Sequence, residues 1–508
     1  MADYDLAIIG GGLNGVSIAR DAAGRGLRVI LLEQGDLGGG ASSASSRLIH
    51  SDLAALESGA LFRVHAALAE RAIWLRTAPH LVRPLRFVIP LHQDERPPWV
   101  LRAALLLYDR FGASADLPRS ATLDLTHNEI GVALKRPYRM AFAYSDCIVD
   151  DSRLVIQNAL DAAEHGAAIH TGARCARADR TDTWRLVVID RGHRRIVSAR
   201  ALVNATGAWT ESVAETVLRV PPPRVRLTRT GQIVVARRFE ADNAYVFQNT
   251  DRRLIYVCPY ERDFTIIGSV EKTFKGDPAV VSMSADEIGL LCEAASRYFR
   301  EPVHPADVTR TVSGANAVRA VVGRSFARDG STIFDQRRGQ APLITVFGGD
   351  ITTSRIRAEN AVSKLVPFYP MSPRWTADRP LPGGDFSWSR FDDQVDKARQ
   401  RWRFLSENEA GRLVGAYGTR IADVLGEAQS RDDLGPAFGE SLTAAEVRYL
   451  MQKEWARFPD DILWRRSKLG LTMTVQDQEA LAGFMVFQAG ATSDAMGTSS
   501  TYTNPETS

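Results

Sequence analysis

The stretch Tyr-Asp-Leu-Ala-Ile-Ile-Gly-Gly-Gly-Leu-Asn-Gly, residues 4–15, decides the fold of this chain. It joins an apolar run directly to a glycine cluster, and a helix-like segment, Val16 to Arg25, comes next. A second apolar run then ends on Glu33. Strand, tight turn, helix and strand in this order predict the first unit of a dinucleotide-binding sheet, with Glu33 placed to accept hydrogen bonds from the adenosine ribose.

The glycines of this stretch predict a phosphate site. Gly10 permits the tight turn, Gly12 lets the backbone approach a pyrophosphate, and Gly15 lets the helix pack closely on the strand. The N-terminus of the helix, at Leu13 and Asn14, offers N–H groups and a partial positive charge to the phosphates. The alternative is a glycine turn kept for packing alone, but the spacing, the strand, the helix and the terminal acid all favour an ADP moiety.

Length and composition limit the class of protein. A chain of 508 residues is expected to form two or three domains, and 45% hydrophobic with 24% charged residues is typical of a folded protein. A net charge of +3 argues against nucleic acid as a partner. The four cysteines form no CxxC pair, which favours buried or free thiols in a reducing compartment, and no metal site is expected. No apolar run approaches the ~20 residues of a spanning helix, and the first strand begins too early for a signal peptide, so we expect a cytoplasmic protein.

A loop of small residues, 38–46, follows the first unit and leads to His50. Small side chains allow the backbone to pass close to a flat ligand, and Ser42, Ser43 and Ser45 are expected to hydrogen-bond phosphate or ring edges. The alternative is a flexible surface linker. The position of the loop directly after the cofactor unit favours a ligand contact.

Two later segments return to the same pattern. Residues 201–209 and 343–350 contain apolar runs that end in Ala-Thr-Gly and Gly-Gly-Asp, and helix-like sequence follows each of them. We expect both runs to be strands of the same sheet whose ends approach the cofactor, with a second anion site at the helix that starts near Thr353. The predicted cofactor contacts in these segments are Gly207, Trp209, Gly349, Asp350 and Thr352.

The remaining sequence predicts an inserted sheet and several helices. Period-two alternation over 225–275 predicts an antiparallel sheet within the α/β unit. Helices are expected at 61–78 and at 154–165, the second of them capped by Asp151 and Ser152. The apolar segment 97–111 also predicts a helix, for which burial in the protein core is favoured over a place in a bilayer interface.

The predicted organisation is an oxidoreductase unit, a helical domain and a tail. The Pro- and Gly-rich segment 380–385 is typical of a linker, and the composition of the tail predicts disorder. The expected parts are an oxidoreductase unit at 1–385, with cofactor-binding segments at about 1–80, 140–220 and 340–370 and β-rich substrate segments at about 81–140 and 221–340; a helical domain at 386–485; and the tail at 486–508.

Stretches that resemble one known family are spread along nearly the whole chain. They are Ile8 to Asp21, Leu48 to His50, Tyr144 to Leu154, Val203 to Trp209, Asp263 to Pro278, Phe347 to Glu359, Leu381 to Gly384, Glu446 to Leu450 and Asp461 to Gly470. Together they resemble the FAD-dependent, quinone-linked glycerol-3-phosphate dehydrogenases.

This resemblance implies an α/β protein with a glutathione-reductase-type FAD-binding domain, an inserted β-rich substrate domain and a C-terminal α-helical domain. It implies FAD as the cofactor, a polyol phosphate or other alcohol as the substrate, and quinone or another acceptor for the electrons. His50 and Arg355 match family positions and are the predicted catalytic residues. A peripheral place on the inner face of the cytoplasmic membrane and a homodimer are compatible with the resemblance.

The chain departs from the family pattern where the family binds its substrate. The family's Arg-Tyr pair after the histidine is Ala54-Ala55 here, and a family histidine is Gln232. A family arginine and a family lysine are replaced by Asn316 and Asp350. Phosphate recognition rests on Arg forks and Lys charges, so these changes weaken it. The arginines that remain nearby are Arg319, Arg324, Arg355 and Arg357.

Three functions stay open on the sequence alone. The first is oxidation of the secondary alcohol of glycerol 3-phosphate or a related polyol phosphate. The second is a diverged flavin dehydrogenase for a non-phosphorylated polyol or other alcohol, which the carboxylates gained at Asp52 and Asp350 favour. The third is a catalytically silent FAD-binding scaffold or regulator.

Overall fold

The computed structural model describes residues 2–51, 60–91, 98–112, 117–136, 138–249, 253–319 and 330–497. Two compact units make up the chain, unit 1 over Met1–Phe391 and unit 2 over Asp392–Ser508. The division lies close to the boundary that the sequence predicts after residue 385.

The first sheet of unit 1 contains the dinucleotide stretch. Five of its strands are parallel in the order β7-β2-β1-β10-β17, and β16 joins β17 in the antiparallel sense. A hairpin of β8 and β9 pairs with the first part of β10. The eight strands found in the described residues are β1 (Tyr4–Ile9), β2 (Val29–Glu33), β7 (Ala168–Thr171), β8 (Ala173–Arg180), β9 (Trp184–Asp190), β10 (His193–Asn204), β16 (Ser331–Asp335) and β17 (Leu343–Phe347).

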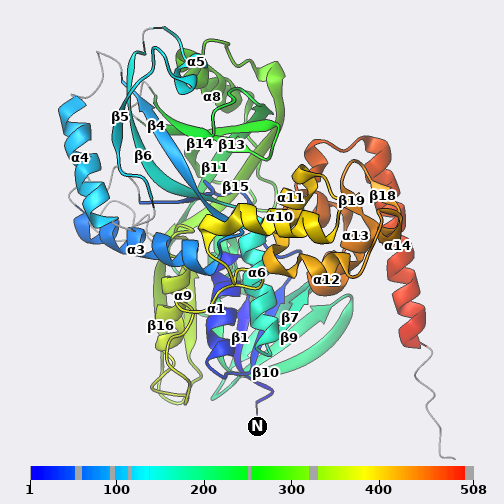
Figure 1. The fold of residues 1–508 in the computed structure, drawn as a ribbon. Coiled ribbons are helices and arrows are strands. Elements are labelled where there is room, and N and C mark those ends of the chain that lie inside the picture. Colours follow the sequence, from blue (N-terminus) through cyan, green and yellow to red (C-terminus); the bar gives the residue numbers. More distant parts are fainter. Residues whose placement is uncertain are drawn as a thin grey trace, which may run out of the picture. The chain divides into compact units, whose positions relative to one another are not determined.

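Both faces of this sheet are covered, as near-continuous apolar runs in parallel strands require. On one face Ile9, Ile30 and Leu202 pack in a buried cluster with Trp184 and Leu186 of the β8–β9 layer. On the other face lies α1 (Leu13–Gly24), which contacts α6 (Asp151–Glu164) and α9 (Ser354–Ser363). Figure 1 shows these helices beside the central strands.

The second sheet of unit 1 is mainly antiparallel and has the order β15-β11-β14-β13-β12-β4-β6-β3, with β5 on β6. Its nine strands in the described chain are β3 (Leu48–Ile49), β4 (Val82–Pro90), β5 (Ala121–Asp124), β6 (Met140–Val149), β11 (Val225–Ala236), β12 (Asn243–Gln248), β13 (Leu254–Tyr260), β14 (Phe264–Phe274) and β15 (Val308–Arg319). The predicted period-two sheet therefore exists.

For three strands the predicted segments imply the wrong sheet. β3 and β6 lie in the second sheet although they fall within the predicted cofactor segments, and β16 lies in the first sheet although it falls within a predicted substrate segment. β6 is buried along nearly its whole length. A continuous buried run does not show whether its partners are parallel or antiparallel, so the pattern could not assign it.

The second sheet has two different faces. One face packs on α8 (Ala285–Tyr298) and forms an apolar core. The other face approaches the 41–50 segment, because the Gln232 amide donates to Ser45 O at 2.8 Å and the Thr230 hydroxyl to Ala44 O at 3.4 Å. A Cβ on Gly314 would lie 2.9 Å from Ala41 Cα. This second face therefore borders the predicted cofactor site.

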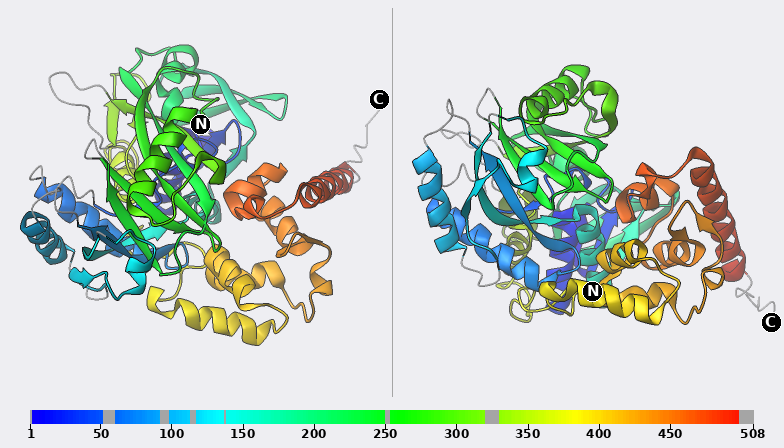
Figure 2. Two further views of the ribbon diagram at one scale, coloured as in Figure 1. Left: turned by 90° about the horizontal axis from the view of Figure 1, so that it is seen from above. Right: turned by 45° about the horizontal axis from the view of Figure 1, so that its top comes forward.

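Two helices lie side by side at the edge of the second sheet, α3 (Leu61–Thr77) and α4 (Pro98–Phe111) (Figure 2). The predicted burial of α4 in the core is wrong, because only Leu105 and Tyr108 are buried there while Trp99 is 74% and Leu106 53% exposed. The apolar composition of α4 misled the prediction, since one narrow stripe faces the protein. The short helices of unit 1 are α5 (Glu129–Val132) and α7 (Thr210–Ser212).

Unit 2 is helical, as its sequence predicts. Its elements are α10 (Phe391–Arg401), α11 (Glu407–Tyr417), α12 (Ile421–Leu425), α13 (Ala444–Lys453), α14 (Val475–Gly497) and the short pair β18 (Ala437–Phe438) and β19 (Leu442–Thr443). Buried Glu446 accepts from Arg412 at 2.7 and 2.8 Å and from the Tyr417 hydroxyl at 2.8 Å.

The predicted disorder from residue 486 is wrong for the described part of the tail, since α14 continues to Gly497. Leu481 and Met485, one helical turn apart, are buried and anchor this helix. Residues 498–508 lie outside the described residues.

Two further expectations concern membranes and thiols. In the described chain no helix combines the length and the apolar character needed to cross a membrane. Cys147, Cys175, Cys258 and Cys292 are buried free thiols, as predicted. Burial raises the pKa of each thiol.

Candidate functional site: a dinucleotide cradle with a histidine beside it

The glycine turn after β1 has no room for side chains. Gly10 has φ +109°, and a Cβ there would lie 2.5 Å from Ala205 O at the end of β10. A Cβ on Gly15 would lie 1.9 Å from Gly10 O. Both positions therefore need glycine, one for backbone conformation and one for the close approach of α1 to β1.

The N-terminus of α1 is open to an anion. Its N-cap residue, Gly12, supplies no side-chain cap, and the Leu13 N–H donates to Ser42 Oγ at 3.0 Å. A Cβ at Gly12 would lie 3.0 Å from the same oxygen. The helix dipole and the absence of a side chain at Gly12 fit a pyrophosphate.

The Glu33 carboxylate is oriented by two backbone amides. Its oxygens accept from Gly11 N and Gly35 N, each at 2.7 Å. Burial raises the pKa of Glu33, and the two amides act against that rise. Each oxygen keeps a free lone pair, so the group still fits a ribose diol.

The serine loop is held in place largely by its own serines. Ser45 Oγ donates to Asp151 Oδ2 at 2.7 Å, and Ser43 Oγ donates to Gly40 O at 3.3 Å. Asp151 is therefore a loop anchor rather than the predicted helix cap, a part that Asp150 plays by accepting from Arg153 N. The ligand contacts predicted for these serines stay predictions.

The ends of β10 and β17 reach the same place. Gly207 has φ +56°, and Trp209 lies 3.7 Å from the position of a Cβ on Gly40. The Asn14 amide donates to Gly348 O at 3.0 Å and accepts from Arg357 at 2.8 Å. The structure thus brings the four predicted strand ends together around the start of α1.

The N-terminus of α9, where an anion site is predicted, has a carboxylate beside it. Asp350 Oδ1 accepts from the Thr353 N–H at 2.7 Å and from its hydroxyl at 2.6 Å. Nearby, the Arg357 guanidinium lies 2.2 Å from the position of a Cβ on Gly349. The Asp350 carboxylate thus binds the N-cap residue Thr353 and leaves α9 without a side-chain cap, so the anion site at this helix stays a prediction.

His50 is fixed by its backbone beside this cradle. Its N–H donates to Thr352 Oγ1 at 3.0 Å, and the same hydroxyl donates to His50 O at 3.0 Å. The imidazole meets the Tyr256 ring edge-on at 5.6 Å. Its Nδ1 atom is buried with no hydrogen-bond partner among the described residues. The backbone is therefore anchored while the ring keeps an unused nitrogen.

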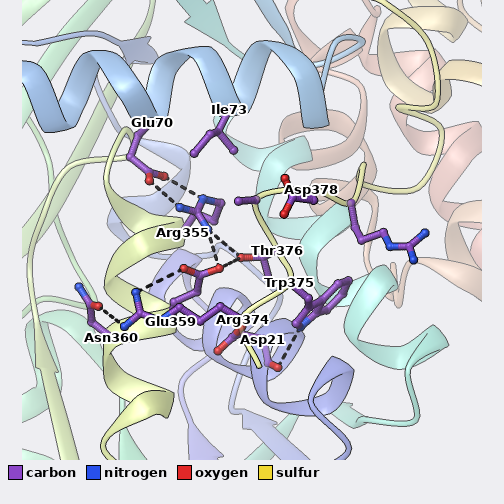
Figure 3. A network of polar contacts seen from close by, with 12 residues as sticks. Asp21, Glu70, Ile73, Arg355, Glu359, Asn360, Arg374, Trp375, Thr376 and Asp378 are labelled. Carbon is purple, nitrogen blue, oxygen red and sulfur yellow. Dashed lines mark hydrogen bonds and ion pairs between the residues drawn. The ribbon is translucent and has the colours of Figure 1, made fainter. Parts of the chain in front are cut away.

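Arg355 does not have the geometry of a catalytic residue. Figure 3 shows its guanidinium between two carboxylates, Glu70 of α3 at 2.6 and 2.9 Å and Glu359 of α9 at 2.6 Å. A third partner is Thr376 Oγ1, at 3.0 Å. All three ionic side chains are buried. The structure therefore gives Arg355 a structural role in place of the predicted catalytic one: it joins α3 to α9.

The altered substrate positions are described only in part. Ala54 and Ala55 lie outside the described residues. Gln232 is buried, and its Oε1 atom has no partner in the described chain. Asn316 lies 3.7 Å from the position of a Cβ on Gly348, next to the end of β17. Two neutral amides thus border the site.

Sequence reasoning missed the polar groups behind His50. Asp146 of β6 is buried and binds Arg71 of α3 at 2.6 Å and the Tyr108 hydroxyl of α4 at 2.7 Å. The available signal was an aspartate within a mainly apolar run, because buried carboxylates require partners.

Comparison with known proteins agrees with this geometry. The FAD-dependent oxidoreductase family matches residues 5–355, and the C-terminal domain of alpha-glycerophosphate oxidase matches residues 374–489. A glycerol-3-phosphate dehydrogenase of Pseudomonas aeruginosa is 41% identical over 95% of both chains. A D-erythritol 1-phosphate dehydrogenase of Brucella abortus is 39% identical over 94% of this chain and 96% of that one.

A solved structure shares the fold. The glycerol-3-phosphate dehydrogenase of Bacillus halodurans, complexed with FAD, has a TM-score of 0.72 at 21% identity and covers 95% of this chain and 94% of that chain. The predicted fold class and the predicted FAD-dependent class are confirmed. The chain belongs to the FAD-dependent oxidoreductases and, among them, to the glycerol-3-phosphate dehydrogenase family.

Proposed function

We propose that this protein is an FAD-dependent dehydrogenase that oxidises the secondary alcohol of glycerol 3-phosphate or a related polyol phosphate. The observation that carries the proposal is the link between the dinucleotide cradle and His50. Asn14 binds Gly348 at the end of β17, and Thr352 of the following turn binds the His50 backbone. The relatives named for glycerol 3-phosphate and erythritol 1-phosphate give the substrate class.

Each part of the site has one task in this reaction. The N-terminus of α1 and the glycine turn hold the pyrophosphate of FAD, and Glu33 holds the ribose. When bound, FAD supplies the acceptor for a hydride. The His50 imidazole, whose backbone is held by Thr352, accepts the hydroxyl proton of the substrate.

The electron acceptor and the location of the protein complete the proposal. We assign quinone as the acceptor and the inner face of the cytoplasmic membrane as the place of reaction. The exposed apolar side chains of α4, Trp99 and Leu106, favour contact with a bilayer interface. A homodimer is compatible with this arrangement.

A second candidate substrate is an alcohol without phosphate. Arg47, Arg355 and Arg357, all near the site, already have internal partners: Asp151 at 3.5 Å, Glu70 at 2.6 Å and Asn14 at 2.8 Å. The segment 52–59, which lies outside the described residues, contains two acids and no base. These features favour a substrate that carries no dianion.

Anaerobic flavin reduction separates the candidates. The purified holoprotein is mixed with glycerol 3-phosphate, erythritol 1-phosphate, glycerol and erythritol, and loss of oxidised-flavin absorbance is followed. Reduction by a phosphate ester supports the first function, and reduction by a free polyol alone supports the second. A flavin that none of the four reduces points to the silent scaffold.

A charge-restoring variant sharpens this choice. If the substrate has no phosphate, Asn316→Arg with Asp350→Lys should lower the KM for glycerol 3-phosphate by at least about tenfold, because each charge-assisted hydrogen bond contributes roughly 1.5–3 kcal/mol. If wild-type protein already binds the phosphate well, the same variant should bring no gain.

A further inference from the structure

A buried ion pair lies behind His50 and joins three elements. Arg71 Nη1 of α3 lies 2.6 Å from Asp146 Oδ1 of β6, and both side chains are at most 3% exposed. The other carboxylate oxygen accepts from the Tyr108 hydroxyl of α4 at 2.7 Å. One carboxylate therefore fixes α3, α4 and β6 to each other.

The Tyr108 hydroxyl also reaches the segment that carries His50. The Ser51 N–H, the next amide along the chain, donates to Tyr108 Oη at 3.2 Å. On its other side the segment is held by Thr352, which makes two hydrogen bonds to the His50 backbone. Tyr108 and Thr352 thus hold successive residues from opposite directions, and the ring is positioned through its backbone.

The Asp146 carboxylate also orients the Tyr108 hydroxyl. Because Tyr108 Oη donates its proton to Asp146, the same oxygen accepts from the Ser51 N–H. Burial raises the pKa of Asp146, and the positive charge of Arg71 acts against that rise.

We propose that Tyr108 is a positioning residue of the dehydrogenation: its hydroxyl, oriented by the Asp146 carboxylate, holds the His50–Ser51 backbone so that the imidazole is placed to accept the proton of the substrate hydroxyl. The proton passes to the His50 ring nitrogen, the hydride with its electron pair passes from the carbinol carbon to FAD, and the product is a carbonyl compound. The inference rests on the proposed function, in which His50 is the proton acceptor.

The rate of flavin reduction tests the role of Tyr108. Tyr108→Phe removes the hydroxyl that accepts from the Ser51 N–H and keeps the aromatic ring and the ion pair between Asp146 and Arg71. It should lower the rate of flavin reduction at saturating substrate by about threefold to tenfold and leave the KM within about twofold, because the imidazole is held less firmly while the substrate contacts remain.

A matched control separates positioning from folding. Tyr245 is a buried tyrosine on the opposite face of the second sheet, and its hydroxyl donates to Ile130 O at 2.5 Å. Tyr245→Phe should lower the thermal stability and leave both the rate of flavin reduction and the KM unchanged. Equal effects of Tyr245→Phe and Tyr108→Phe on the rate would overturn the role of Tyr108.

A measurement without substrate keeps the inference separate from the proposed function. Hydrogen–deuterium exchange of the holoprotein reports on the Ser51 amide through the peptide that contains it. Tyr108→Phe should speed the exchange of this amide by at least about fivefold, and Tyr245→Phe should leave it unchanged. An unchanged exchange rate in Tyr108→Phe overturns the inference, whereas a flavin that no alcohol of the panel reduces in wild-type protein overturns the proposed function.

Discussion

At the residue scale, the dinucleotide turn has no room for a methyl group at Gly15. A Cβ at Gly15 would lie 1.9 Å from Gly10 O, which is backbone and cannot move aside cheaply. Gly15→Ala should therefore lower the FAD content of the purified protein at least about tenfold, since overpacking of this kind costs roughly 1–3 kcal/mol or more. Flavin absorbance per protein checks this outcome.

Gly289→Ala is the matched control for this change. Gly289 lies within α8, and a Cβ there meets nothing within 4 Å. The substitution should keep full FAD content and add about 0.5–1 kcal/mol of stability from helix propensity. Equal FAD content in both variants would contradict the close approach of α1 to β1.

At the element scale, the buried ion pairs between α3 and α9 depend on one guanidinium, that of Arg355. Arg355→Gln leaves Glu70 and Glu359 buried without their counter-charge, a change that costs roughly 3–5 kcal/mol. We expect a large fall in Tm together with reduced FAD retention. The same network contains a second arginine that serves as the control (Figure 3). Arg374 is half-exposed and lies 3.8 Å from Glu359.

Arg374→Gln should change stability by about 0–1 kcal/mol, as exposed ion pairs do. Thermal unfolding of both variants, followed by flavin fluorescence, gives the difference. An Arg355→Gln protein with wild-type Tm and a much slower flavin reduction would restore the catalytic role first assigned to this residue.

Sequence patterns predicted the elements better than the tasks of their side chains. The strand ends around Gly10, Glu33, Gly207 and Gly349 were found because apolar runs and glycine turns are local signals. The task of Arg355 was not found, since its partner Glu70 is 285 residues away along the chain. The surface position of α4 was missed because composition does not show which stripe of a helix faces the protein.

At the scale of the whole molecule, the exposed side of α4 predicts where unit 1 meets a bilayer. Trp99 and Leu106 are more than half exposed, and Arg102 and Arg110 lie on the same helix. Trp99→Glu with Leu106→Glu should reduce flotation with anionic vesicles of phosphatidylglycerol at least about tenfold, through lost apolar burial and added repulsion. Buried Leu105 is left intact so that the fold survives.

Val280→Glu supplies the control for flotation. Val280 is 73% exposed in the connection between β14 and α8, so it tests whether any exposed apolar residue has this effect. We expect this variant to float like the wild type. Equal flotation of all three proteins would remove α4 from the proposed membrane contact.

The order of strands in the first sheet also governs when the protein can acquire its cofactor. β1 pairs with β2 on one side and with β10 on the other, where Tyr4 lies opposite Ala199. β10 pairs in turn with β17, where Leu202 lies opposite Leu343. Long-range parallel pairing of this kind forms late. Asn14 does not meet its partner Gly348 until that part of the chain has left the ribosome. The dinucleotide site that begins at the first residues is therefore completed only near the end of synthesis of unit 1. We expect FAD to bind after unit 1 has been synthesised, and not to bind the N-terminal segment while the rest of the unit is still missing.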